Sequence, residues 1–219
     1  YSILAIDLPG HGESEGPALK SIEEMGDWVS DVIDSVGYNE ASLVGHSQGC
    51  LINIECAAKY PDKIKSLSLM GGAGEMPMNP ELLGLAESGD PKAVDLMMDW
   101  AHGPAGHFGG HAVPGLHHLN IGGTIVRNGS VKVLGTDFRA CDNYKNGFIS
   151  ASKIKCPVIN ILGEKDRMCP IKAGKKVADE IKNSEIVVIP NCGHMILLEE
   201  ADQALAALKK FIKVNHPPK

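Results

Sequence analysis

The stretch Gly45-His46-Ser47-Gln48-Gly49 decides the fold of this sequence. It has the form G-x-S-x-G, which needs a strand before it and a helix after it. Both are predicted here, because the short apolar run Ala41–Val44 precedes it and a helical pattern continues from about Gln48 to Tyr60, before Pro61. A strand-to-helix turn this sharp strains the backbone at Ser47 and presents its hydroxyl at the edge of a sheet. We therefore expect Ser47 to be a nucleophile.

The neighbours of Ser47 suit such a turn. Bulky side chains two residues to either side would collide, so we expect the glycines Gly45 and Gly49 to relieve crowding. The helix N-terminus behind Ser47 favours negative charge. The backbone N–H of Gln48 is then placed to donate to an oxyanion.

Strands and helices alternate in the first third of the chain. The apolar segments Tyr1–Leu8 and Ile64–Met70 predict strands, and the first of them ends in the turn Pro9-Gly10-His11-Gly12. Between them, apolar residues recur at helical spacing from Ser21 to Gly37. This order predicts an α/β fold with a mainly parallel sheet and helices on its faces.

The strand rhythm is lost between residues 74 and 152. There Asp90-Pro91 begins a helix, and residues 103–115 are interpreted as a structured loop. Asn128-Gly129, between Ile125-Val126 and Val131-Lys132-Val133, predicts a hairpin. We interpret residues 74–152 as an inserted, mostly helical cap, and residues 1–73 and 153–219 together as the core domain.

The last part of the chain returns to the alternating pattern. Pro157–Leu162 and Glu185–Ile189 predict strands, and Pro170 begins a helix. A final helix is predicted from about Glu199 to Val214, with acidic residues in its first turn and lysines in its last, as the helix dipole favours.

Candidate partners for the nucleophile follow these two strands. His194 comes after the second strand and Asp166 after the first, where side chains gather at the carboxyl edge of a parallel sheet. We expect His194 to be the general base and Asp166 to orient and stabilise it, in the chain order nucleophile, acid, base. Glu164 is a rival for the acid, and Asp137 and Asp142 are weaker rivals because they lie in the cap.

The remaining reactive side chains are expected to be structural. His11 is a turn residue near the site, His46 packs under the turn at the nucleophile, and Cys192 has no base of its own in the sequence. Five further histidines lie in the cap at spacings that fit no metal-ligand pattern, so we predict neither a metal nor a cofactor. They are His102, His107, His111, His117 and His118.

Four segments in order resemble motifs of the α/β-hydrolase superfamily: residues 7–14 (Asp-Leu-Pro-Gly-His-Gly-Glu-Ser), Gly45–Gly49, Gly163–Asp166 and Gly193-His194. The resemblance covers nearly the whole chain, and cap segments 103–107 and 137–142 are similar to bacterial members. It implies that superfamily's fold and a triad of Ser47, Asp166 and His194.

The resemblance also implies what this sequence lacks. Tyr1–Leu8 corresponds to the fourth strand of the usual fold, so we expect the first three strands to be absent, with the loop that supplies a second oxyanion donor. Two explanations are open: a piece of a longer gene product, or a natural short form whose sheet edge a partner covers. A bare edge at Tyr1–Leu8 would invite strand pairing, so we also expect a homo-oligomer.

The expected function is that of a serine hydrolase, which cleaves a carboxylic ester or a similar acyl substrate through an acyl-enzyme on Ser47. The alternatives are a C–C bond hydrolase or a perhydrolase on the same triad, and a ligand-binding protein that keeps the fold without turnover. Dehalogenases and epoxide hydrolases are disfavoured, because they use a carboxylate where Ser47 stands.

The amino-acid composition limits which kinds of partner and which cellular compartment we expect. The 219 residues are 43% apolar and carry a net charge of −6, which gives no basic footprint for nucleic acid. No apolar run approaches the roughly 18 residues that span a bilayer. The six cysteines form no disulfide framework, which indicates the reducing cytoplasm. We expect a small-molecule substrate, and neither nucleic acid nor a membrane as partner.

Overall fold

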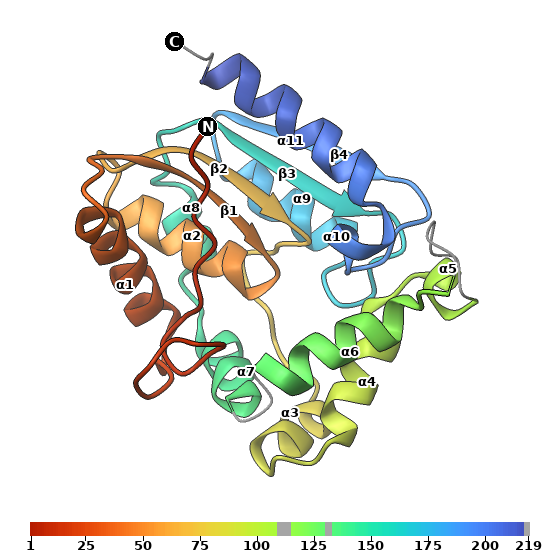
Figure 1. Cartoon of the computed structure of the whole chain (residues 1–219). Coiled ribbons are helices and arrows are strands. Elements are labelled where there is room, and N and C mark those ends of the chain that lie inside the picture. The colour runs from red at the N-terminus through yellow and green to blue at the C-terminus, as the bar shows by residue number, and fades with distance from the viewer. Residues whose placement is uncertain (109–114, 130–132, 217–219) are drawn as a thin grey trace.

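Figure 1 shows the computed structural model of the chain, which describes residues 1–108, 115–129 and 133–216. Four strands form one parallel sheet in the order β1-β2-β3-β4. Each agrees within two residues at either end with a strand predicted from the apolar runs, and the α/β class is confirmed. The strands are β1 (Ala41–His46), β2 (Ile64–Met70), β3 (Val158–Gly163) and β4 (Ser184–Ile189).

Helices cover both faces of this sheet (Figure 1). On one face α2 packs against β1 and β2, and α9 packs against β3 and β4. Helix α1 lies against α2, and α8 lies against both α2 and α9. On the other face α11 crosses β3 and β4. The bounds are α1 (Ile22–Ser35), α2 (Gln48–Lys59), α8 (Gly147–Ala151), α9 (Ile171–Asp179), α10 (Ile196–Glu199) and α11 (Ala201–Asn215).

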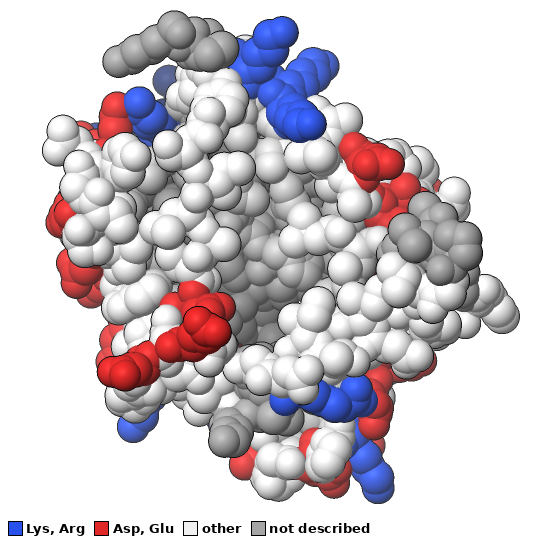
Figure 2. All heavy atoms as spheres, in the orientation of Figure 1, with Lys and Arg blue, Asp and Glu red and all other residues white. Residues whose placement is uncertain are grey.

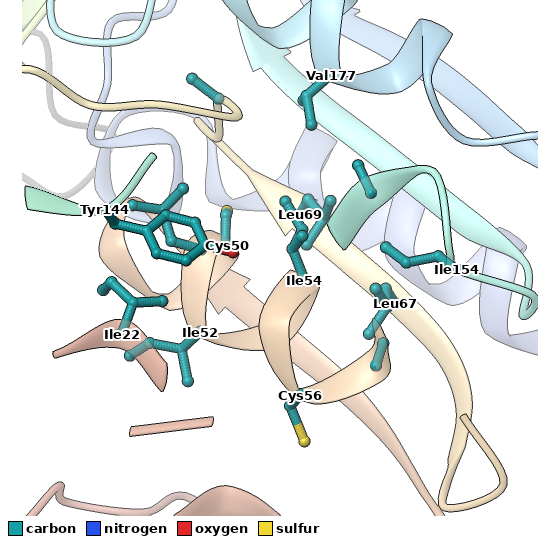
Figure 3. Packing of buried hydrophobic residues seen from close by; sticks show 14 of the residues in the cluster. Ile22, Cys50, Ile52, Ile54, Cys56, Leu67, Leu69, Tyr144, Ile154 and Val177 are labelled. Atoms are coloured by element: carbon teal, nitrogen blue, oxygen red, sulfur yellow. The ribbon is translucent and has the colours of Figure 1, made fainter. Parts of the chain in front are cut away.

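The alternation of side chains along the strands builds a core on each face. In β3, Val158 joins the cluster under α2 and α9, whereas Ile159 and Ile161 join the cluster under α11. Figure 3 shows the first cluster, in which Ile54 of α2 points toward Leu69 of β2. Because both faces are buried, β3 is apolar at nearly every position, as is typical of a central parallel strand.

Within residues 74–152, the part that the structure describes contains helices and connecting loops but no strand. Their side chains make a small core of their own, to which Leu82, Val94 and Phe138 belong, while Tyr144 reaches the main core beside α2. The segment predicted as a loop contains a short helix, and residues 109–114 of it lie outside the described chain. The helices are α3 (Pro80–Glu87), α4 (Lys92–Ala101), α5 (Pro104–His107), α6 (His118–Gly129), α7 (Leu134–Asn143) and α8.

The hairpin predicted around Asn128-Gly129 is wrong. Helix α6 continues through both residues and ends at Gly129. Its neighbour explains the difference, because Gly122 lies so close to α4 that a Cβ there would come 2.8 Å from Sδ of Met98. Packing against α4 thus outweighs the turn preference of Asn-Gly. Residues 130–132, the start of the predicted second strand, lie outside the described chain.

The strand predicted at Tyr1–Leu8 is also wrong. The segment forms no ladder with the sheet, and Ile3 is 91% exposed. A strand is stable only when a neighbour satisfies its N–H and C=O groups. Among the described residues the sheet ends at β1, which pairs only with β2, and the apolar run makes no ladder with the other edge of β1.

None of the helices in the described ranges has the length and apolarity needed to cross a bilayer.

Candidate active site

Ser47 lies in a strained turn between β1 and α2. Its φ and ψ are 53° and −120°, a backbone conformation that L-residues rarely adopt. Two main-chain hydrogen bonds hold it there, since its N–H donates to Met70 O (3.0 Å) and its carbonyl accepts from Cys50 N (2.8 Å). Strain of this kind persists where the surroundings impose it, and it gathers at functional sites.

At this turn, Gly45 is the glycine whose position leaves no room for a side chain. A Cβ on Gly45 would lie 2.4 Å from the carbonyl oxygen of Gly49 and 2.6 Å from Nδ2 of Asn53. A Cβ on Gly49 would meet no described atom within 4 Å. The two glycines expected to share one role therefore differ, because the backbone of Gly49 occupies the space that a side chain at residue 45 would need.

His194 and Asp166 meet in a region closed to solvent. Nδ1 of His194 lies 2.8 Å from Oδ2 of Asp166, and the two residues are 2% and 6% exposed. Oδ1 of Asp166 accepts hydrogen bonds from the main-chain N–H groups of Met168 (2.8 Å) and Cys169 (2.7 Å). An ionised carboxylate only accepts, so the proton sits on Nδ1 of His194 and Nε2 keeps its lone pair.

His194 also lies beside the turn that carries Ser47. Its ring centroid is 4.8 Å from that of His46, and a Cβ on Gly71 would be 3.1 Å from its Nδ1. Gly71 follows Met70, whose carbonyl holds the N–H of Ser47. Nε2 of His194 is buried and has no hydrogen-bond partner among the described residues, so the hydrogen bond that a general base accepts from its serine is not formed in this structure.

His46 supports the base without sharing its role. Its Nε2 donates to the carbonyl oxygen of His194 at 2.7 Å. Loss of hydration, reinforced by the neighbouring His194, lowers the pKa of His46 to about 4. The ring is therefore neutral near pH 7 and packs against His194, as its predicted structural role requires.

The cap segment holds the loop of His194 in place. The N–H of His194 donates to Ala101 O at 2.7 Å, at the end of α4. Oε2 of Glu199, in α10, accepts from both Gly103 N (2.7 Å) and Gly193 N (3.1 Å). Glu199 thus links Gly103, two residues after α4, to Gly193, the residue before His194, and no sequence motif indicates this link.

The rival carboxylates lie elsewhere. Glu164 accepts from Asn191 N at 2.9 Å, and Asp142 accepts from Met78 N at 2.9 Å. Asp137 lies 2.8 Å from Nε2 of His11, a partner that sequence reasoning missed for both residues. Of the carboxylates weighed from the sequence, Asp166 is the one that contacts His194.

The other residues considered from the sequence take different places. Cys192 is buried, and burial raises the pKa of its thiol, so it stays protonated. In the cap, His102 is buried and His107 contacts Asp99, while His111 lies outside the described residues. Within the described ranges no three His, Cys, Asp or Glu side chains are grouped to hold a metal ion.

The surface gives access to this edge of the sheet. The face in Figure 2 is hollowed between the N-terminal segment and α6, in front of the place where β1 ends and α2 begins in Figure 1. A strained serine after a strand, a histidine after β4 and an aspartate after β3 therefore gather at one edge.

Comparison with known proteins agrees with the fold described above. The sequence model of the Alpha/beta hydrolase family matches residues 1–208. The chain belongs to this family. Its members' fold, with a parallel sheet flanked by helices, is the fold described above.

Individual relatives of this hydrolase cover most of its length. A pimeloyl-[acyl-carrier protein] methyl ester esterase of Neisseria meningitidis is 26% identical over 97% of this chain and 84% of its own. A 2-hydroxy-6-oxononadienedioate/2-hydroxy-6-oxononatrienedioate hydrolase of Burkholderia vietnamiensis is 25% identical over 97% of this chain and 77% of its own. The solved structure of a thermophilic esterase matches with a TM-score of 0.81 and 29% identity, over 96% of this chain and 80% of its own.

Proposed function

We propose that this hydrolase cleaves a carboxylic ester, or a similar acyl substrate, through an acyl-enzyme on Ser47. The observation that carries the proposal is the buried His194–Asp166 pair, 2.8 Å between Nδ1 and Oδ2, beside a serine with positive φ. The esterases and hydrolases among its relatives support the reaction class.

In the first half-reaction, Oγ of Ser47 attacks the carbonyl carbon while Nε2 of His194 takes the hydroxyl proton. The negative charge that develops on the carbonyl oxygen is stabilised by the N–H of Gln48, at the start of α2. Asp166 stabilises the imidazolium. The bond to the leaving group then breaks, and His194 gives its proton to the departing oxygen.

In the second half-reaction, water attacks the acyl-enzyme. His194 takes a proton from the water, the bond between the acyl carbon and Ser47 Oγ breaks, and the proton returns to Ser47. The residues of this cycle end as they began, and the products are an acid and an alcohol. The cap helices set which acyl groups fit.

We place the reaction in the cytoplasm with a small-molecule substrate. All six cysteines are free in the structure, which fits a reducing compartment. The names of the relatives point to carboxylic esters as the first compounds to assay, and we begin with esters of modest size.

The test is a panel of acyl esters and thioesters, assayed with the native protein and with Ser47→Ala. We expect the native protein to turn over at least one of them and Ser47→Ala to lose about 10³-fold or more in kcat, since the serine and its base act as a unit. Activity of Ser47→Ala equal to native would overturn the proposal.

A second candidate is hydrolysis of a C–C bond in a diketone-like substrate on the same three residues. The Burkholderia relative, whose name describes an oxo-dienedioate, favours it. Turnover of such a compound with no ester hydrolysis would select this candidate, and perhydrolysis is detected in the same assay with peroxide and a carboxylic acid. Binding of ligands without any turnover would instead indicate a non-catalytic member of the fold.

A further inference from the structure

A second histidine–carboxylate pair lies next to Gln48, the residue that follows the nucleophile. His11, in the turn after residue 8, places its Nε2 2.8 Å from Oδ2 of Asp137 in α7. Both side chains are largely closed to solvent, at 15% and 10% exposure. The pair joins residues 126 positions apart in the chain and so fastens the turn to the cap.

Both ring nitrogens of His11 face acceptors. Nδ1 lies 3.1 Å from the carbonyl oxygen of Pro9, and Nε2 faces the carboxylate of Asp137. A ring that donates from both nitrogens is an imidazolium, and the hydrogen bond to Asp137 raises the pKa of His11. The two acceptors and the raised pKa both favour the imidazolium form, so the contact has the geometry of an ion pair that is partly withdrawn from water.

Asp137 also contacts the residue after the nucleophile. Its main-chain carbonyl oxygen accepts a hydrogen bond from Nε2 of Gln48 at 3.1 Å. Gln48 is the first residue of α2, and its backbone N–H is the oxyanion donor in the proposed reaction. Asp137 thus binds the side chain of Gln48 through its main-chain carbonyl and binds His11 through its carboxylate.

We propose that His11 and Asp137 are positioning residues of the acyl-transfer site, which fix Gln48 through the carbonyl of Asp137. The inference rests on the proposed function, because Gln48 matters here as the oxyanion donor. Neither residue touches the reacting atoms. Their effect is on the transition state, where the oxyanion forms, and they leave ground-state binding of the substrate unchanged.

The second contact of the same turn with the cap supports this role. The N–H of Gly12 donates to the carbonyl oxygen of Gly129, at the end of α6, at 3.1 Å. The turn is braced from within, because the carboxylate of Asp7 accepts from Glu13 N at 3.2 Å and Ser14 Oγ donates to Asp7 O at 2.7 Å. The turn therefore contacts both α6, through Gly12, and α7, through His11.

The test compares kcat and KM for one good ester substrate in native protein and in four variants. Asp137→Asn keeps the carbonyl that Gln48 contacts but loses the charge, His11→Ala removes the ion pair, and Gln48→Met keeps the backbone N–H but loses Nε2. The double variant His11→Ala/Gln48→Met completes a cycle. Arg139→Gln is the control, since it breaks an exposed ion pair of the same helix with Glu87.

We expect each single change to lower kcat about 10-fold with KM within about twofold, since losing the whole donor costs roughly 10²–10³ and these residues only restrain it. The double variant should be no slower than the slower single variant, because both changes cut the same link. Arg139→Gln should keep native kcat. If His11→Ala does not fold, His11→Gln retains a donor toward Asp137 and should lie between native and Asp137→Asn.

Two results would overturn the inference. One is native kcat in both Asp137→Asn and the His11 variant. The other is losses that multiply in the double variant, which would mean that His11 acts on general stability and not through Gln48. If the native protein neither hydrolyses an ester nor reacts at Ser47, the proposed function is wrong, and the role of His11 and Asp137 is wrong with it. That outcome differs from an active native protein whose variants keep native kcat, which would contradict only the role of the two residues.

Discussion

Asp166 receives three hydrogen bonds that together fix its carboxylate against His194. Oδ2 lies 2.8 Å from Nδ1 of His194, and Oδ1 accepts from the N–H groups of Met168 and Cys169. The main-chain donors hold the carboxylate, and the carboxylate in turn holds the imidazole with Nε2 directed away from it. The orientation of the base is therefore set by the loop after β3 and does not depend on substrate.

Replacing Asp166 by Asn tests this relationship. An amide can present Nδ2 to His194, which would force the proton onto Nε2 and remove the lone pair that accepts from Ser47. We expect kcat to fall by about 10³–10⁴ while folding is retained. Steady-state hydrolysis of the best ester provides the measurement. Glu164→Gln, two residues earlier and exposed, is the matched control and should keep native kcat.

The two glycines of the turn should respond differently to alanine. A Cβ at residue 45 would collide with the carbonyl of Gly49, so Gly45→Ala should lower the free energy of unfolding by about 3 kcal/mol. The Cβ of Gly49→Ala would point into open space among the described atoms. This variant should raise the free energy of unfolding by no more than about 1 kcal/mol. Urea unfolding of both variants measures the difference. Equal losses would contradict the geometry.

The His11–Asp137 pair should make stability depend on pH. Because the pKa of His11 is raised in the folded protein, the stabilisation from the pair is fully present below about pH 6.5, the unfolded value, and is lost as pH rises through the folded value. Unfolding free energies of native protein and His11→Gln, measured from pH 5.5 to 9, should differ most at the acid end. A gap that stays constant with pH would show that folding does not raise the pKa of His11.

We propose that β1 is the edge through which copies of the chain associate. The bare edge was expected at Tyr1–Leu8, but that segment is not a strand, and in the described structure the sheet ends at β1, where Val44 is 51% exposed. Size-exclusion chromatography with light scattering should give a dimer or a larger species, and Val44→Lys should weaken it. Val214→Lys, on the exposed end of α11, is the control. A native protein that is only monomeric contradicts the proposal.

The sheet was predictable because its strands carry their own signals. Ile64–Met70 was predicted to the residue, since both of its faces are buried and the apolar run has clear ends. The turn at Ser47 and the contact between His194 and Asp166 were predictable too, because a motif within five residues fixes the turn and the carboxyl ends of neighbouring parallel strands place the other two residues side by side.

The features that could not be predicted from the sequence depend on contacts between segments that are far apart in the chain. Tyr1–Leu8 has the composition of a strand, but whether it becomes one depends on a neighbour. Asn128-Gly129 ends a helix because α6 packs on α4. The residues near position 128 in the sequence give no sign of this packing. The link from His11 through Asp137 to Gln48 joins three segments far apart in the chain, and neither spacing nor residue type marks it.

The most direct test of the central claim is covalent labelling of Ser47. A fluorophosphonate probe reacts with a serine only when a base activates it and an oxyanion site receives the charge. Native protein should gain the mass of one probe on the peptide that contains Ser47, and Ser47→Ala should gain none. No label on the native protein, or a label of equal extent on Ser47→Ala, would contradict the assignment of Ser47 as the nucleophile.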